Sequence, residues 1–509
     1  MFASGNVKRF FGFILLMVLA GNGVISGQVL SLPGSTPVSR LEQDYRYNPA
    51  AFILLDSLTW GGVALRYNSF GGEHLYSLSE GNEGYFVRAD AGGYKINPGK
   101  GIYSGAALWE TGVNKGVRWT NVRDAELLYP YLVADSLGGD YHHERYGLEG
   151  SWAMYAGKGI YGLRVGYLGE MAYRLRDPRP KNTVSELTLN PGAMWMSDDH
   201  YWGAFVKYVF YRQHLTTKIE EPYRKDMFYV LTGMGLYDYY FSAIGQSFAR
   251  YYRSHEYQGG VQFGYLPQGV SGMAAYSRRK MEVEESDYRK PFKLTTDQVE
   301  IGLKWQKNLS RSVLVLRVNG DRSWRNGTER TFEKVKTDEQ TGVFVWKLLT
   351  ESKKHRLEQT NGHIGLLLQR KVSDRQLWWY GLDGFWREER ERYLLPEYGK
   401  KLADLTGTVN VGFRRDFGDK QLEVEFRGGY KKNVSSSLAS PAVQTVVQGM
   451  LLPEYAYRCQ DYYTGRLKLE YRLPVYRQAM LAFYLDTHGN YAGSDRYRWQ
   501  TEAGVRVDF

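Results

Sequence analysis

The last residues of the chain, Tyr497 to Phe509, read YRWQTEAGVRVDF and alternate between two kinds of side chain. Mostly apolar residues occupy every second position: Tyr497, Trp499, Thr501, Ala503, Val505, Val507 and Phe509. Polar residues and one glycine lie between them: Arg498, Gln500, Glu502, Gly504, Arg506 and Asp508. Successive side chains of a strand point to opposite faces, so the stretch predicts a strand with one apolar and one polar face.

The same alternation recurs along the chain. The stretches 463–473, 422–430 and 299–305 each set apolar residues against charged ones. These stretches are longer than the roughly 5–6 residues of a soluble strand and close to the roughly 9–11 that cross a bilayer at a tilt. The pattern predicts membrane-crossing strands from position 57 onward, because no helical stripe of comparable length follows the N-terminal 27 residues.

The connections between these stretches alternate in length. Tight links fall at 157–159, 197–200, 266–270, 306–310, 371–375, 416–420 and 473–477, and longer ones at 213–254, 281–293, 321–356, 389–402 and 433–460. Outer-membrane barrels alternate in this way, with short periplasmic turns and long extracellular loops. Because an open sheet edge in hydrocarbon leaves backbone groups unbonded, the last strand, near 494–509, is expected to pair with the first, near 57–69. We therefore predict an all-β fold, a transmembrane antiparallel β-barrel of about 18 strands, with about 14–20 as the range.

Composition fits this architecture. The 509 residues include 42 Tyr, 13 Trp and 57 Gly but only 15 Pro, a balance that favours extended strands. The negative mean hydropathy excludes a bundle of transmembrane helices. The only cysteine is Cys459, so an internal disulfide and a cysteine-based metal site are both excluded.

The N-terminus has the form of a secretory signal peptide. Lys8 and Arg9 precede an apolar run from Phe10 to Ala20, and small residues follow it. We predict a signal peptide over 1–27, an irregular segment over 28–56 and a barrel over 57–509. The net charge of +11 does not indicate nucleic acid, to which a secreted chain has little access; a polar lumen or anionic headgroups suit it better.

Charged residues on the polar faces of these strands are predicted to line the lumen. They are Glu300, Lys304, Glu423, Glu425, Arg427, Arg466, Lys468, Glu470, Arg472, Arg498, Glu502 and Arg506. Because their signs are mixed, one interpretation is a ladder of cross-strand ion pairs that fills or stiffens the interior. The alternative is a lumen that selects anionic solutes, since Arg and Lys predominate modestly.

Aromatic residues on the apolar faces are predicted to form lipid-facing girdles. They are Trp378, Tyr380, Trp386, Tyr497, Trp499 and Phe509. In LWWYGLDGFWR, Trp378 and Trp386 share a face and lie eight residues apart. At ~3.3 Å per residue and a tilt near ~40°, that spacing projects to roughly 20 Å, close to an apolar band about 25 Å tall.

Catalytic and metal motifs give weak signals. The chain contains neither G-x-S-x-G nor H-E-x-x-H. His142 and His143 would need a bent strand to share a metal, because adjacent strand residues face opposite ways. Asp198, Asp199 and His200 resemble the acid–His combination of outer-membrane proteases, but the predicted topology puts them on the periplasmic side, where such a site would be misplaced. His363 is a candidate for a phospholipase-type site at the lipid boundary, but the sequence supplies no Ser at a fixed place for it. We therefore expect no catalytic residue, no metal and no cofactor.

Three features resemble outer-membrane barrels of Bacteroidota: YNPAAF at Tyr47 to Phe52, the tyrosine-rich strands and the terminal VRVDF. The Asn-Pro-Ala-Ala stretch is similar to one near the N-terminus of fatty-acid-transporter-like barrels. The resemblance implies that assembly machinery recognises the terminal aromatic residue, and that the barrel lies in outer-membrane lipid beside a TonB-dependent receptor. The resemblance carries over no functional residue. The charged, tyrosine-containing loops at 280–290 and 387–401 are either solvated surface or a docking face for a surface lipoprotein or receptor. We expect non-catalytic passage of solutes or accessory service in an uptake complex; the alternatives are a plugged structural barrel and an outer-membrane hydrolase.

Overall fold

The computed structural model describes residues 47–54, 59–97, 99–220, 227–242, 247–266, 268–336, 344–442, 444–476 and 479–509. The predicted signal peptide lies outside these ranges, and of the predicted irregular segment 28–56 they contain only 47–54, most of it the 3₁₀ helix η1 (Pro49–Leu54). No helix within the described ranges is long and apolar enough to cross a membrane.

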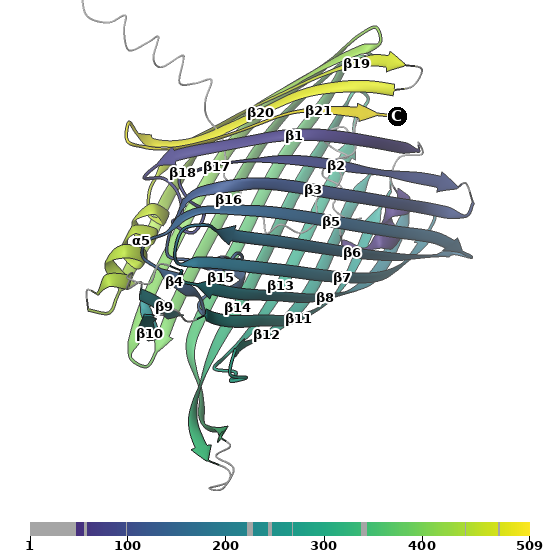
Figure 1. The fold of residues 1–509 in the computed structure, drawn as a ribbon. Helices are drawn as coiled ribbons and strands as arrows, with labels where there is room; N and C mark the ends of the chain where they lie inside the picture. The colour runs from purple at the N-terminus through teal and green to yellow at the C-terminus, as the bar shows by residue number, and fades with distance from the viewer. Residues whose placement is uncertain are drawn as a thin grey trace, which may run out of the picture.

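Eighteen antiparallel strands form one closed sheet, as predicted (Figure 1). They are β1 (Trp60–Glu73), β2 (Glu83–Asn97), β3 (Gly101–Val117), β5 (Gly139–Ala156), β6 (Gly159–Arg174), β7 (Arg179–Ser197), β8 (His200–Lys218), β11 (Ser247–Tyr265), β12 (Gly269–Glu285), β13 (Phe292–Asn308), β14 (Ser312–Lys336), β15 (Phe344–Ser373), β16 (Gln376–Leu394), β17 (Glu397–Phe417), β18 (Lys420–Ala439), β19 (Tyr462–Tyr476), β20 (Ala479–Gly493) and β21 (Arg496–Asp508). Each strand pairs with its sequence neighbours in the barrel, so the topology is a simple meander.

The first and last strands close the barrel. β1 pairs with β21 from Gly62↔Asp508 to Glu73↔Tyr497. Beyond this ladder, Gly61 and Phe509 exchange two backbone hydrogen bonds of 2.8 Å each. The two-faced terminal stretch thus leaves no sheet edge at this seam, as lipid requires.

The two ends of the barrel differ. At the turn end, where Phe509 lies, the β5–β6 and β17–β18 hairpins close through two residues, of which the first is a glycine with positive φ (63° at Gly157 and 65° at Gly418). Glycine adopts this conformation without the steric cost that a Cβ brings. The opposite loop end carries the connections 118–138, 219–246 and 440–461.

Several segments predicted as loops are strand extensions. Most of 321–356 belongs to β14 and β15, 281–293 is largely strand, and 389–402 is an extended hairpin between β16 and β17. The prediction was wrong there because beyond the bilayer both faces of a strand meet water. The apolar alternation then disappears, while the ladder hydrogen bonds continue.

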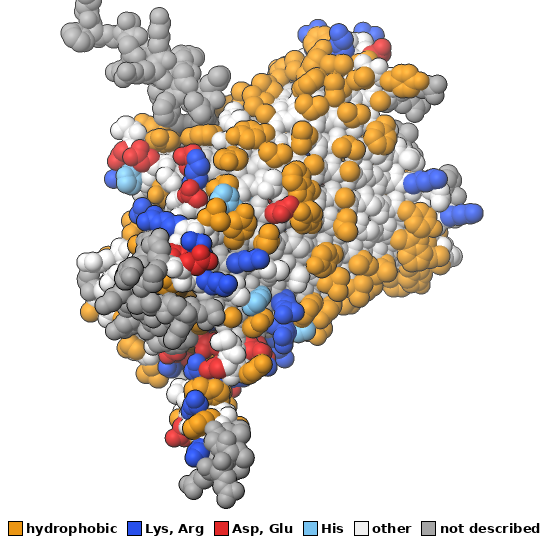
Figure 2. All heavy atoms as spheres, in the orientation of Figure 1, with side chains coloured by type: hydrophobic (Ala, Val, Ile, Leu, Met, Phe, Trp, Pro, Cys, Tyr) orange, Lys and Arg blue, Asp and Glu red, His pale blue; other side chains and the backbone are white. Residues whose placement is uncertain are grey.

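An apolar belt surrounds the barrel, and Figure 2 shows charged side chains gathering towards its ends. Outward-facing residues of many strands are exposed, among them Val63, Leu65, Leu148, Val165, Trp202, Val206, Val261, Ile301, Leu382, Val409, Phe426, Phe483 and Val505. A contiguous apolar surface of this extent is what a transmembrane barrel presents to lipid.

A small folded cap fills one side of the interior at the loop end. Its sheet consists of β4 (Val133–Asp135), β9 (Met227–Gly233) and β10 (Leu236–Ser242), with the short helix α4 (Ala125–Leu128) beside it. Buried cap residues such as Trp119 and Phe228 pack in one cluster with inward side chains of β7, β8, β11, β12 and β13. The Arg174 guanidinium, almost fully buried, donates to Asp135 at 2.7 Å and ties the cap to β6.

A helical segment covers the other side of the loop end. It comprises the π-helical turn η2 (Val447–Leu451) and helix α5 (Leu452–Arg458). The Glu454 carboxylate accepts hydrogen bonds from the Ser77 hydroxyl and the Leu78 amide, next to β1. The Lys431 ammonium of β18 donates to the carbonyl of Arg458 at 2.8 Å. Cap and helical segment together cover the loop end.

Candidate functional site

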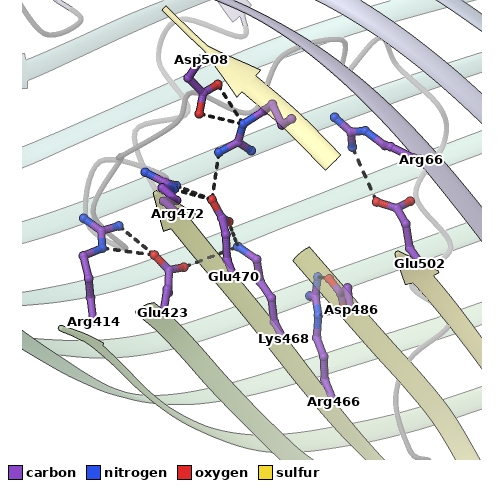
Figure 3. Close-up of polar contacts among 11 residues, drawn as sticks. Arg66, Arg414, Glu423, Arg466, Lys468, Glu470, Arg472, Asp486, Glu502 and Asp508 are labelled. Atoms are coloured by element: carbon purple, nitrogen blue, oxygen red, sulfur yellow. Dashed lines mark hydrogen bonds and ion pairs between the residues drawn. The ribbon is translucent and has the colours of Figure 1, made fainter. Parts of the chain in front are cut away.

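One side of the interior is lined by paired charges, which we call the ion-pair wall (Figure 3). It extends from β17 through β21 to β1 and comprises Arg66, Arg414, Glu423, Arg466, Lys468, Glu470, Arg472, Asp486, Glu502, Arg506 and Asp508. These residues meet because the antiparallel register sets inward positions of neighbouring strands opposite one another, as with Arg414 and Glu423.

Glu470 lies at the centre of the wall. Its Oε1 accepts from Arg472 at 2.5 Å and from Arg506 at 2.8 Å, while Lys468 lies 3.6 Å from Oε2. Arg506 also donates to Asp508 at 2.9 Å. The Glu470 carboxylate is nearly buried, so these cations stabilise a charge that burial alone would disfavour.

The structure joins five of the twelve predicted lumen residues in one network: Glu423, Lys468, Glu470, Arg472 and Arg506. Four others form ion pairs outside this network. Arg466 contacts Asp486 at 2.5 Å, and Glu502 contacts Arg66 at 3.7 Å. Glu425 and Arg427 contact each other at 3.8 Å. Arg498 contacts Glu80 of the loop end at 2.8 Å. Glu300 and Lys304 lie apart from the wall, on β13.

Four members of the wall are absent from the lumen residues predicted from the sequence: Arg66, Arg414, Asp486 and Asp508. All four fall in stretches that alternate, 60–70, 410–417, 479–490 and 497–509, so the signal was present in the same periodicity. Their partners could not be predicted because pairing depends on the register between strands.

The predicted girdle residues all share the outward parity of their strands. Tyr380, Trp386 and Phe509 are exposed, whereas Trp378, Tyr497 and Trp499 are partly covered. Trp378 packs on Phe413 with 5.3 Å between ring centroids. Trp499 lies over Gly71 of β1, whose missing side chain leaves room for the indole.

The YNPAAF motif lies inside the barrel near the turn end, as an insert formed by residues 47–54. Asn48 is fully buried and donates to the carbonyl of Ala193 at 3.0 Å, while its own oxygen accepts from the Ala50 amide. The insert docks where the β7–β8 ladder is interrupted, between Leu189 and Gly192. In the sequence the motif is recognisable only as a resemblance, and nothing in its residues predicts a place in the interior.

Gly192 is needed for this docking, because a Cβ there would lie 2.1 Å from the Asn48 side-chain oxygen. Gly192→Ala is expected to displace the insert and to cost about 1–3 kcal/mol by overpacking. Hydrogen exchange of the Ala50 and Ala51 amides should then accelerate at least about tenfold. Gly166→Ala is the matched control, since its Cβ would meet nothing closer than 3.8 Å. Unchanged protection in Gly192→Ala would show that Gly192 does not hold the insert in place.

A buried charged junction connects both loop-end covers to the barrel wall. Glu391 of β16 accepts from His355 at 2.9 Å and from Lys400 at 2.7 Å, and the Tyr129 hydroxyl of the cap donates to it. Glu389, two residues away on the same face, binds Arg458 of α5 at 3.0 Å and Lys400 at 3.1 Å.

The junction lies beyond the apolar belt, because the outward neighbours on this stretch of β16 are the charged residues Glu388, Arg390 and Arg392. Burial by itself would raise the pKa of the Glu391 carboxyl. The Lys400 charge and the His355 hydrogen bond overcome burial and lower that pKa to about 2.

The histidines singled out in the sequence lie apart from one another. His143 faces Glu110 at 3.5 Å, whereas the His142 ring stacks on Tyr173 at 5.4 Å. His363 donates a 2.9 Å hydrogen bond from Nε2 to the Asp383 carboxylate on the inward face, away from the apolar belt. The described residues contain no group of three potential metal ligands.

These features define a transmembrane barrel with a polar inner wall, an internal N-terminal insert and a covered loop end. The chain belongs to the family of unknown function DUF6850, whose model matches residues 50–509. No curated protein matches the sequence.

The chain is also similar to several solved structures, at low sequence identity. A variant of the ferric enterobactin receptor PfeA from Pseudomonas aeruginosa is 8% identical, with a TM-score of 0.38, covering 88% of this chain and 80% of that chain. The copper transporter OprC is 9% identical with a TM-score of 0.37, covering 88% and 80%. The TodX monoaromatic hydrocarbon channel is 9% identical with a TM-score of 0.30, covering 91% and 92%.

Proposed function

We propose that this protein is an outer-membrane barrel through which small polar solutes pass along the ion-pair wall, without catalysis. The observation that carries the proposal is the accessible interior on this side. The Arg466 side chain remains 32% exposed, and inward-facing Phe385 of β16 is 38% exposed. The insert packs mainly on β5 to β7, with Phe52 also against Tyr94 of β2 and Tyr47 bonded to Glu300 of β13. The cap packs on β7, β8 and β11 to β13. The apolar belt and the predicted signal peptide support the outer-membrane location.

A wall of alternating, paired charges suits such passage. Each charge already has a partner, so a solute of either sign meets hydrogen-bonding groups without a single deep electrostatic trap. Positive and negative charges are balanced along the wall. This balance favours a lumen lined by a ladder of ion pairs over a lumen that selects anions. Passage then depends on the loop end, where α5 lies over the wall.

Glu454→Ala is expected to raise the conductance of the purified protein in a planar bilayer. The substitution removes the acceptor for Ser77 and Leu78 that holds α5 against the rim. Hydrogen bonds to a charged group contribute about 1.5–3 kcal/mol, so the open fraction should rise about tenfold or more. Glu397→Ala, at an exposed acid of the same end, is the control and should behave as wild type.

A second candidate function, an accessory role in an uptake complex, is favoured by one separate observation. Beyond the barrel, residues 331–336 of β14 and 344–353 of β15 pair only with each other and project as a ribbon (Figure 1). The ribbon exposes Phe344, Leu348 and Leu349. Exposed apolar residues beside free strand edges are features of docking surfaces. Silence of both wild type and Glu454→Ala in the bilayer would overturn passage and favour this role.

A further inference from the structure

Two cations face each other inside the barrel at a small cavity. The β13–β14 register sets Lys304 directly opposite Arg317, and both are on the inward face. The cavity beside them has a volume of about 160 Å³. Like charges directly opposite one another in a sheet are destabilising, so this pair needs a source of negative charge.

The surrounding residues supply little of that charge. The acid within reach of Arg317 is Asp383 at 3.6 Å, and it is already bonded to His363 at 2.9 Å and Asn410 at 3.1 Å. Within the described ranges no carboxylate lies at ion-pair distance from Lys304. On the ion-pair wall, by contrast, the single carboxylate of Glu470 contacts three cations.

The remaining lining adds neutral donors on the same side. Ser271 of β12 lies opposite Lys304, and the Asn319 amide follows two positions after Arg317 on the same face. Glu300 also lines the cavity, but it is four residues from Lys304, roughly 13 Å along the strand. Its carboxylate accepts from the Tyr47 hydroxyl of the insert, which covers the cavity from the lumen.

We propose that Lys304, Arg317, Ser271 and Asn319 form a binding site for a small oxyanion, under the cover of Tyr47. A carboxylate or phosphate group would neutralise both cations and accept from the hydroxyl and the amide. The proposal deepens the proposed function, on which it rests, because the bound group would belong to a solute that enters the lumen.

The test measures binding of inorganic phosphate and of acetate to the detergent-solubilised protein. The readout is the broadening of the NMR lines of each ion when the protein is added. Wild type should broaden the lines of at least one ion saturably. Lys304→Gln should weaken that binding about tenfold, because it removes a charged donor. Lys307→Gln is the matched control: Lys307 is on the same strand but exposed, outside the cavity.

Folding of each variant is checked by heat-modifiable migration on a gel. If Lys304→Gln does not fold, Asn319→Ala removes a neutral donor and should weaken binding about threefold. A response to phosphate alone, or to acetate alone, supports the site and identifies the group it prefers. Absence of broadening by wild type, or equal broadening by Lys304→Gln and Lys307→Gln, overturns it. Binding by a barrel that is silent in a bilayer overturns solute passage and leaves the oxyanion site standing.

Discussion

Replacing Val505 with proline is expected to prevent the barrel from closing. Val505 lies in the middle of β21, paired with Leu65 of β1 and Phe483 of β20. Proline lacks the N–H that a carbonyl of one of these neighbours accepts, so a ladder hydrogen bond is lost in the middle of the sheet. Within hydrocarbon the carbonyl left unbonded adds several kcal/mol, because no water can replace the lost donor. The purified chain should lose heat-modifiable migration and its β-sheet circular dichroism.

Val505→Ile is the control, since it keeps the donor and the apolar outward face. The chain itself contains an informative contrast in Pro191 of β7. That proline is found where the β7–β8 ladder is already interrupted and the insert docks. A folded, heat-modifiable Val505→Pro protein would therefore show that the β21 seam does not need its continuous ladder.

Glu391→Ala is expected to release the loop-end cap and α5 from the barrel wall. The substitution leaves the fully buried His355 without its carboxylate partner, removes the acceptor of the Tyr129 hydroxyl, and leaves the largely buried Lys400 with Glu389. Removing one partner of a buried charge network costs about 3–5 kcal/mol. Hydrogen exchange in 118–138 and 444–460 should lose its protection, while the barrel strands keep theirs.

Glu388→Ala is the matched control for Glu391→Ala. Glu388 is on the outer face three residues before Glu391, and its partner Arg390 is more than half exposed. Exposed ion pairs contribute about 0–1 kcal/mol, so protection should hardly change. Equal losses in both variants would rule out a special role for the buried junction.

The junction also predicts a dependence on acid. The pKa of Glu391 is lowered in the folded protein from its ordinary 4.5 to about 2. A depressed carboxyl pKa contributes stability that is complete above about 4.5 and is lost as the pH falls towards about 2. Wild-type protection of the loop end should decline across this window, and Glu391→Ala should show a smaller decline.

The barrel itself could be predicted from the sequence because its signal is local. Alternation in stretches such as 497–509 and 463–473 reports which face meets lipid, and the seam follows from the need to satisfy backbone groups there. Strand number and the two-ended arrangement followed from the spacing of these stretches. Outside the belt the signal disappears, so the extensions of β14 and β15 were read as loops.

The interior could not be predicted in the same way. The sequence determined that Lys468, Glu470 and Arg506 face inward. Only the register of the closed sheet decided that they share one network, while Lys304 and Arg317 confront each other at a cavity. The docking of Asn48 beside Gly192 joins positions far apart in the chain. Periodicity is set by each residue and its neighbours, whereas partners are set by how distant strands align, which only tertiary structure decides.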